Sequence, residues 1–214
     1  MYVPKHFAQP DVASLHALMR AQPLATLVTL SGGTLDANHL PLYLLDAAVP
    51  GDNPHGMLQG HVARANPLWR ECQQGAEVLA VFHGPQAYIT PSWYPGKKED
   101  GKAVPTWNYA VVHAHGTLRV IDDVRWLKAH VEMLTARQES AFAEPWAVSD
   151  APADYVDKLL KAVVGIEIVL TRLVGKWKTS QNQPPQNRAG VVSGLSCGAG
   201  EAAVAMAALV ASST

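Results

Sequence analysis

The sequence is poor in cysteine, in long hydrophobic runs and in any excess of one charge, and each shortage excludes a class of protein. Cys72 and Cys197 are the only cysteines among 214 residues, which excludes a disulfide framework and a four-cysteine zinc site. The most apolar stretch, residues 202–211, is about half as long as the roughly 20 residues of a membrane-spanning helix. Seventeen basic residues face 18 acidic ones, and a net charge of −1 argues against strong non-specific binding to DNA. Residues 1–10 contain no basic segment followed by an apolar run, so we expect a cytoplasmic protein without a secretory signal.

What is present is a globular composition with short apolar segments separated by turn residues. The chain is 48% hydrophobic and 16% charged, and it is long enough to bury one large core or two small ones. Helices are expected after Asp11, near Leu68, over residues 124–138 and 153–164, and in the Ala-rich tail from residue 199. Alternating apolar residues predict strands at 25–30, 35–45, 56–63, 77–83, 86–90, 107–121 and 165–174.

The order of these segments indicates the fold class. Strands follow one another mostly as hairpins, and the alternation of strand and helix that is typical of a parallel sheet is missing. We therefore predict a mainly β fold with flanking helices (α+β), in which an antiparallel sheet closes into a small barrel. The predicted organisation is a barrel domain over residues 1–195 with a helical insertion at about 123–164, followed by a tail at 196–214.

A locally basic segment follows the last predicted strand. Residues 171–190 hold four basic residues and no acidic one, although the whole chain is slightly acidic. Within it, Lys176, Lys178, Ser180 and Gln181 combine ammonium, hydroxyl and amide donors, a set that suits a phosphate or the polar edge of a heterocycle. A solvated loop is the alternative interpretation.

Aromatic residues gather around a long Pro-, Gly- and Lys-rich loop at 91–105. Tyr88, Trp93, Tyr94, Trp107 and Tyr109 are five of the 15 Trp, Tyr and Phe residues. Flat side chains beside the donors Thr106 and Asn108 suit a planar, partly polar ligand, and a core patch beneath the loop is the alternative.

Two further groups of side chains are candidates for binding. Arg64 lies just before Asn66 and Pro67, where a helix can begin, so its guanidinium and free helical amides could converge on a phosphate; an ordinary surface arginine is the alternative. His113 and His115 alternate on one strand and point to the same side. No third ligand is specified by spacing, so no metal site is predicted, and a haem or metal binder that uses this pair is kept as an alternative.

Several short segments, taken together, resemble one known family. They are Met1-Tyr2-Val3-Pro4 with Phe7, Ala37-Asn38-His39-Leu40-Pro41, Gly60-His61-Val62-Ala63-Arg64-Ala65-Asn66-Pro67, Tyr88-Ile89-Thr90-Pro91-Ser92-Trp93-Tyr94, Pro105-Thr106-Trp107-Asn108-Tyr109, and Gly175-Lys176 through Ser180-Gln181-Asn182. The sequence is similar to the PaiB-type FMN-binding negative transcriptional regulators, relatives of the pyridoxamine 5′-phosphate oxidase-like split barrels. The Pro-Ser-Trp-Tyr and Pro-Thr-Trp-Asn-Tyr segments, in this order, are the most specific part.

This resemblance implies a split-barrel homodimer that holds FMN at the subunit interface, where flavin-dependent oxidoreduction is one activity such a site allows. It implies that Arg64 grips the FMN phosphate and that Lys178, Ser180 and Gln181 reach the cofactor from the partner subunit. The predicted cofactor-binding residues are His61, Arg64, Asn66, Thr106, Trp107, Asn108, Tyr109, Lys176, Lys178, Ser180 and Gln181, with no catalytic residue assigned. The family name also implies repression of transcription. A repressor that binds DNA directly, without flavin turnover, is the remaining alternative.

Overall fold

The computed structural model describes residues 1–45, 54–72, 75–198 and 200–213. The chain forms two compact units, each made of segments that are distant in the sequence. Unit 1 comprises Met1–Leu18, His83–His113 and Val174–Thr214, and unit 2 comprises Met19–Phe82 and Ala114–Leu173. Three long strands have residues in both units: β6 (Glu77–Ile89), β7 (Thr106–Ile121) and β8 (Val163–Lys178).

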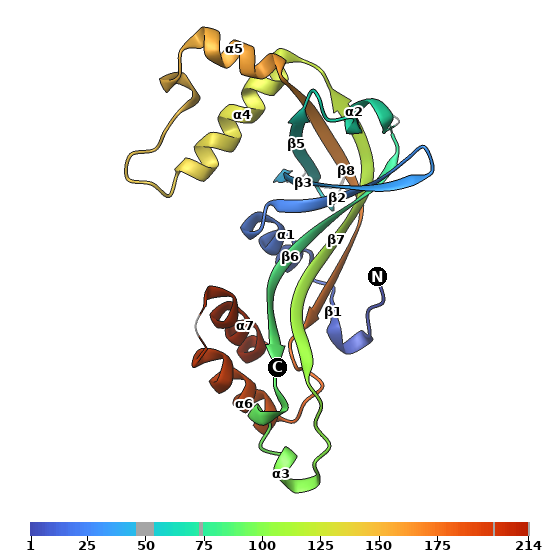
Figure 1. The fold of residues 1–214 in the computed structure, drawn as a ribbon, viewed down its shortest axis with the longest axis vertical. Coiled ribbons are helices and arrows are strands. Elements are labelled where there is room, and N and C mark those ends of the chain that lie inside the picture. Colours follow the sequence, from blue (N-terminus) through green and yellow to red (C-terminus); the bar gives the residue numbers. More distant parts are fainter. Residues whose placement is uncertain (46–53, 73–74, 199, 214) are drawn as a thin grey trace. The chain divides into compact units, whose positions relative to one another are not determined.

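Eight strands form one sheet within the described residues, and the prediction of a mainly β fold with flanking helices is confirmed (Figure 1). The strand order is β3-β2-β6-β7-β8-β5-β4, and β1 pairs with β8. The pairings β1–β8, β2–β3, β2–β6, β4–β5 and β5–β8 are antiparallel. The remaining strands are β1 (Ala8–Gln9), β2 (Leu24–Ser31), β3 (Thr34–Pro41), β4 (Tyr43–Leu45) and β5 (Met57–Ala63).

In unit 2 the sheet curls until β3 and β5 meet. The β2–β3 hairpin turns at Gly32 and Gly33, whose φ angles of 57° and 83° favour glycine and suit a two-residue hairpin turn. Gly60 of β5 lies so near β3 that a Cβ atom there would be 3.0 Å from the carbonyl oxygen of Pro41 and 2.8 Å from Leu42 Cδ2. A side chain at Gly60 would therefore require the Leu42 side chain and the Pro41 carbonyl to shift.

The helices of unit 2 are α2 (Leu68–Glu71), α4 (Val124–Glu139), η3 (Val148–Asp150) and α5 (Ala153–Lys161). Asp123 caps α4, because its carboxylate accepts a hydrogen bond from the Trp126 amide at 2.8 Å. Trp126 then lies against Gly165 of β8, where a Cβ atom would be 2.3 Å from the indole ring. Only glycine at this position lets α4 approach the strand so closely.

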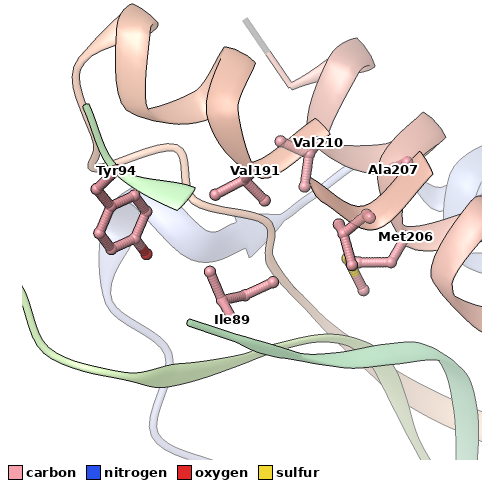
Figure 2. Close-up of a cluster of buried hydrophobic side chains, with 7 residues drawn as sticks. Ile89, Tyr94, Val191, Met206, Ala207 and Val210 are labelled. Carbon is pink, nitrogen blue, oxygen red and sulfur yellow. The ribbon is translucent and has the colours of Figure 1, made fainter. Parts of the chain in front are cut away.

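Unit 1 has its own buried cluster beside two C-terminal helices, α6 (Pro185–Ser196) and α7 (Glu201–Ser212). Figure 2 shows Val191 of α6 and Met206 and Val210 of α7 facing Ile89 of β6, with Tyr94 at one side. Burying these side chains together fastens the two helices to the rest of unit 1. Unit 1 also contains η1 (Lys5–Phe7), the start of α1 (Val12–Ala21), η2 (Pro91–Trp93) and α3 (Lys97–Asp100).

Two predicted strand boundaries are wrong. Gly84 and Pro85 do not separate two strands, because β6 runs through them from Glu77 to Ile89. Gly84 serves packing instead, since a Cβ atom there would be 2.7 Å from Leu18 Cδ1 and 3.1 Å from Ala110 Cβ. The last strand does not end at residue 174 but continues to Lys178, where β1 pairs Ala8 with Lys176.

Other differences concern unit 2 and the C-terminal part. The strand expected at 35–45 is broken at Leu42 into β3 and β4. Tyr43 is only 3% exposed. Its hydroxyl accepts a hydrogen bond from Gln138 Nε2, which satisfies the buried phenol. Helix α5 ends at Lys161 rather than 164, and helix α6 was not anticipated. No helix in the described ranges is long and apolar enough to cross a membrane.

Candidate functional site

A cavity of about 450 Å³ in unit 1 brings together four of the residues predicted to bind a cofactor: Thr106, Asn108, Lys178 and Ser180. We call it the lysine cavity. Its size falls in the usual range for small-molecule and cofactor sites. The other described lining residues are Phe7, Tyr94, Gly96, Lys97, Lys102, Ala103, Val104, Asn182, Gln183, Pro184, Gln186 and Asn187.

The lysine cavity is suited to an anion. Lys97, Lys102 and Lys178 line it, and none of its described lining residues is acidic. The Lys178 ammonium donates a hydrogen bond to Thr106 Oγ1, which holds it over the cavity. Burial lowers the pKa of Lys178, and the positive charge of Lys176 acts in the same direction. A bound phosphate would relieve both effects, because an opposite charge favours the ammonium form.

A fully buried amide lies at one wall of this cavity. Asn108 is 0% exposed and donates from Nδ2 to Ser180 Oγ at 2.9 Å. Its Oδ1 atom is buried and accepts no hydrogen bond from any residue that the structure describes. An orphaned carbonyl oxygen of this kind is costly, so it marks a place where a ligand N–H donor would be stabilised.

Strand alternation decides which predicted residues share the lysine cavity. Thr106 and Asn108 are two apart on β7 and reach it together, whereas Trp107 and Tyr109 line a separate hollow of about 290 Å³. Lys176 is only 9% exposed: its ammonium donates to the Tyr2 carbonyl at 3.2 Å and lies 5.2 Å from the Tyr109 ring centroid.

Gln181 has a local structural task. Its Oε1 accepts from the Thr179 amide at 2.7 Å, and its Nε2 donates to the Trp177 carbonyl at 2.6 Å. These two bonds hold the turn that follows β8. In this turn Ser180 adopts a left-handed conformation with φ of 65°, which directs its hydroxyl to Asn108.

The predicted residues of the Gly60–Pro67 segment lie in unit 2, each with a partner there. Arg64 forms a bidentate pair with Asp122 at 2.6 and 2.9 Å and also donates to the carbonyls of Lys161 and Val163. Four of the five guanidinium donors are thereby used. Asn66 donates to Asn38 Oδ1 at 2.7 Å and accepts from the Leu68 amide, so it also begins helix α2. His61 faces His130, with Nδ1 and Nε2 3.2 Å apart.

The histidines predicted as an alternative metal or haem site have other surroundings. His113 lines the hollow beside Trp107 and Tyr109. His115 Nε2 lies 3.0 Å from Arg172 Nη2, and an imidazole nitrogen that accepts from arginine is engaged rather than open to a metal. Among the described residues, no group of three or more His, Cys, Asp or Glu side chains could hold a metal ion.

Sequence reasoning missed part of the lysine cavity. Lys97 and Lys102 lie in the loop whose lysine content is visible in the sequence, but only the structure turns them toward Lys178. Asn187 belongs to the unexpected helix α6, and its Oδ1 accepts from the Gly96 amide at 3.2 Å. The spacing of Asn187, Val191 and Leu195, four residues apart on one helix face, was the available signal.

Comparison with known sequences gives one family and several relatives. Residues 1–172 match the family described as "Putative FMN-binding domain". An uncharacterized protein of Emericella nidulans is 36% identical over 227 residues, covering 91% of this chain and 90% of its own. The "Protease synthase and sporulation protein PAI 2" of Bacillus subtilis is 30% identical over 183 residues, covering 86% of this chain and 83% of its own.

Comparison with solved structures shows the fold. The FAD and heme binding protein from Mycobacterium smegmatis superimposes with a TM-score of 0.57, covering 80% of this chain and 73% of its own at 18% sequence identity. The strand order and this likeness agree with the predicted antiparallel split β-barrel with flanking helices.

Proposed function

Since the chain belongs to the family of FMN-binding domains that its first 172 residues match, we propose that it is a flavoprotein whose lysine cavity holds part of FMN. The observation that carries this proposal is the pairing of three lysines with the orphaned oxygen of Asn108 in one cavity. FMN has both complementary groups, because it carries a phosphate and its pyrimidine ring has an N–H donor between two carbonyl acceptors.

The residues of the lysine cavity would each do a simple task. The three ammonium groups neutralise an anionic ligand, Asn108 Oδ1 accepts from a ring N–H, and the Thr106 and Ser180 hydroxyls orient Lys178 and Asn108. FMN itself supplies the redox chemistry, and the protein supplies its position and polarity. Arg64, which the resemblance assigns to the FMN phosphate, stays a proposed contact, and the described residues occupy four of its five guanidinium donors.

Lys178→Met is expected to weaken FMN binding at least tenfold. The substitution keeps the length of the side chain and removes a charge-assisted hydrogen bond, for which the ordinary loss is a factor of roughly 10 to 100. The measurement is a titration of FMN with protein, followed by quenching of flavin fluorescence, together with the visible spectrum of the freshly purified protein.

Lys158→Met is the matched control. Lys158 lies on α5 in unit 2 and its ammonium is 3.6 Å from Asp154, on an exposed surface. Its substitution should leave the FMN affinity unchanged. A native protein that neither carries flavin nor quenches the fluorescence of added FMN would overturn the proposed function. Equal FMN affinities for the native protein and Lys178→Met would show that FMN does not bind in the lysine cavity.

We further propose that the flavin-bound form is a homodimer. Two large aromatic side chains are exposed on the outer face of β6 and β7 in unit 1: Tyr88 is 49% exposed and Trp107 is 54% exposed. Their rings meet edge to face with centroids 6.0 Å apart, beside the hollow that Tyr109 and His113 line. Exposed paired aromatic rings are typical of protein interfaces, where Trp and Tyr contribute much of the binding energy.

Trp107→Glu is expected to shift the protein to monomers, with a dimer dissociation constant raised more than tenfold. A carboxylate in the middle of the aromatic surface would have to be desolvated on association. Sedimentation velocity over a range of concentrations measures the change. Leu35→Glu, at an apolar residue of β3 in unit 2 that is 72% exposed, is the control that should not alter association. A native protein that sediments as a monomer at all concentrations contradicts the proposal.

The role in transcription that the resemblance implies stays a prediction. So does the cytoplasmic location. Neither is needed for the proposed binding of FMN.

A further inference from the structure

A further cavity, of about 320 Å³, lies in unit 2 and is lined by residues of β5, α4, α5 and β8. Figure 1 shows α4 and α5 joined as a helical hairpin in this unit. We call this cavity the hairpin cavity. Val131 of α4, Leu160 of α5 and Val163 of β8 are among its apolar walls. None of its described lining residues carries a full charge at neutral pH, in contrast to the lysine cavity. A charged ligand would lose its hydration there without gaining a counter-ion.

The mouth of the hairpin cavity exposes large apolar side chains. Trp146 is 48% exposed, Tyr155 54% and Leu159 50%, and all three line the cavity. Three large apolar side chains at one opening form an apolar surface, and burying it from water would be favourable. Their arrangement around a hollow, rather than on a flat face, suits a small molecule that enters it.

The floor of the hairpin cavity contains an imidazole, His61, which is held by a second one. His61 Nδ1 lies 3.2 Å from Nε2 of His130, which is 3% exposed. The other face of the His130 ring stacks on Trp126, with centroids 5.0 Å apart and an angle of 14°. Burial, and then the charge of His61, lower the pKa of His130 to about 4, and burial lowers the pKa of His61. Both rings are therefore neutral at pH 7.

The tautomers of the two rings follow from the remaining atom of His130. Its Nδ1 is buried and has no hydrogen-bond partner within the described part of the chain. An unpaired buried N–H is rarer in proteins than an unpaired buried acceptor, which favours the tautomer in which His130 carries its proton on Nε2 and donates it to His61 Nδ1. His61 must then carry its own proton on Nε2, the nitrogen that His130 does not occupy. The imidazole thus offers one N–H donor to a cavity that is otherwise mostly apolar.

We propose that the hairpin cavity binds a small, neutral, mainly apolar molecule that bears one hydrogen-bond acceptor, such as a ketone or ether oxygen, and that His61 Nε2–H donates to this acceptor. This site is distinct in chemistry from the proposed FMN site, since FMN carries a phosphate and the hairpin cavity has no described cation to receive it. The two sites can be tested independently.

The probe is prodan, a neutral fluorescent naphthalene that carries one ketone and whose emission shifts to the blue in apolar surroundings. The native protein should bind it with a blue shift. His61→Phe should weaken binding about tenfold, since a buried hydrogen bond is lost, and His61→Gln, which keeps an N–H donor, should restore part of the affinity. Dimethylaminonaphthalene, which lacks the ketone, should bind native protein and His61→Phe equally within about twofold.

A second pair of variants tests the cavity without touching the imidazoles. Leu159→Asn places an amide at the mouth and should weaken the binding of both probes, whereas Lys158→Asn, the adjacent residue on α5 that does not line the cavity, should change neither. Leu159 is half exposed, so its variant is expected to fold. Nitrogen NMR of the histidine rings should show the proton of His61 on Nε2.

Several results would overturn the proposal. They are no blue shift with native protein, equal prodan affinity for native protein and Leu159→Asn, or displacement of prodan by saturating FMN. A change of oligomeric state in Leu159→Asn, measured by sedimentation velocity, would also do so, because the apolar mouth would then be a contact between subunits. Absence of FMN binding, by contrast, contradicts only the proposed flavoprotein function.

Discussion

Gly190→Ala is expected to lower the free energy of unfolding by about 3 kcal/mol or more, at the upper end of what overpacking costs. A Cβ atom at Gly190 of α6 would be 1.9 Å from the carbonyl oxygen of Trp93 and 3.2 Å from Pro95 Cδ. The nearest atom belongs to the backbone, so no rotation of a side chain relieves the clash. Helix α6 must move away from the turn formed by η2, and urea unfolding followed by circular dichroism measures the loss.

The same variant should affect ligand binding, because the contact that fails supports the lysine cavity. Tyr94 follows directly after Trp93, and Asn187 precedes Gly190 on α6; both line that cavity. We expect FMN affinity to fall together with stability. Ser193→Ala, an exposed residue of the same helix, is the control and should be neutral or slightly stabilising, since alanine has the higher helix propensity. A Gly190→Ala protein as stable as the native one would show that α6 does not pack against η2 in this way.

Acidification from pH 7 to pH 4 is expected to destabilise the native protein by about 3 kcal/mol through His130 alone, at about 1.4 kcal/mol for each unit of pKa shift. The pKa of His130 is lowered from 6.5 to about 4 by burial and then by the charge of His61. Between these two pH values His130 is protonated in the unfolded chain and neutral in the folded protein. The contribution to stability is therefore complete above about pH 6.5 and is lost as the pH falls toward 4.

Comparison with His130→Phe isolates this contribution. Phenylalanine keeps an aromatic ring against Trp126 and does not titrate, so unfolding free energies measured in urea should depend less steeply on pH in the variant by about the stated amount. Parallel pH profiles for the native protein and His130→Phe would contradict the buried, neutral imidazole.

Local patterns in the sequence predicted most of the strands and part of the lysine cavity. Thr106 and Asn108 are predicted as donors because they lie beside a group of aromatic residues, and the alternation of β7 sends both to one face of the strand. Lys178 and Ser180 were identified from a segment without acidic residues. Both patterns involve residues that are close in the sequence, and the alternation of side chains along a strand keeps such residues on the same face of the sheet.

The features that sequence reasoning missed depend on contacts between distant residues. Gly190 and Gly194 argue against a helix at α6, because glycine has a low helix propensity. Both glycines are nevertheless needed, since a Cβ atom at either position would clash with Trp93. The partner of Arg64 is Asp122, 58 residues away, and the sequence places that aspartate only at the start of a helix. The pairing of His61 with His130, 69 residues apart, has no local signature either.

Ser180, in the turn after β8, combines a strained backbone with a hydroxyl that contacts Asn108. A left-handed backbone costs a residue other than glycine on the order of 1–3 kcal/mol, and Ser180 adopts it with φ of 65°. Glycine would relax this position but would leave the amide of Asn108 without its acceptor. Backbone strain at Ser180 is therefore tolerated at the position where a hydroxyl is fixed against the buried Asn108 amide.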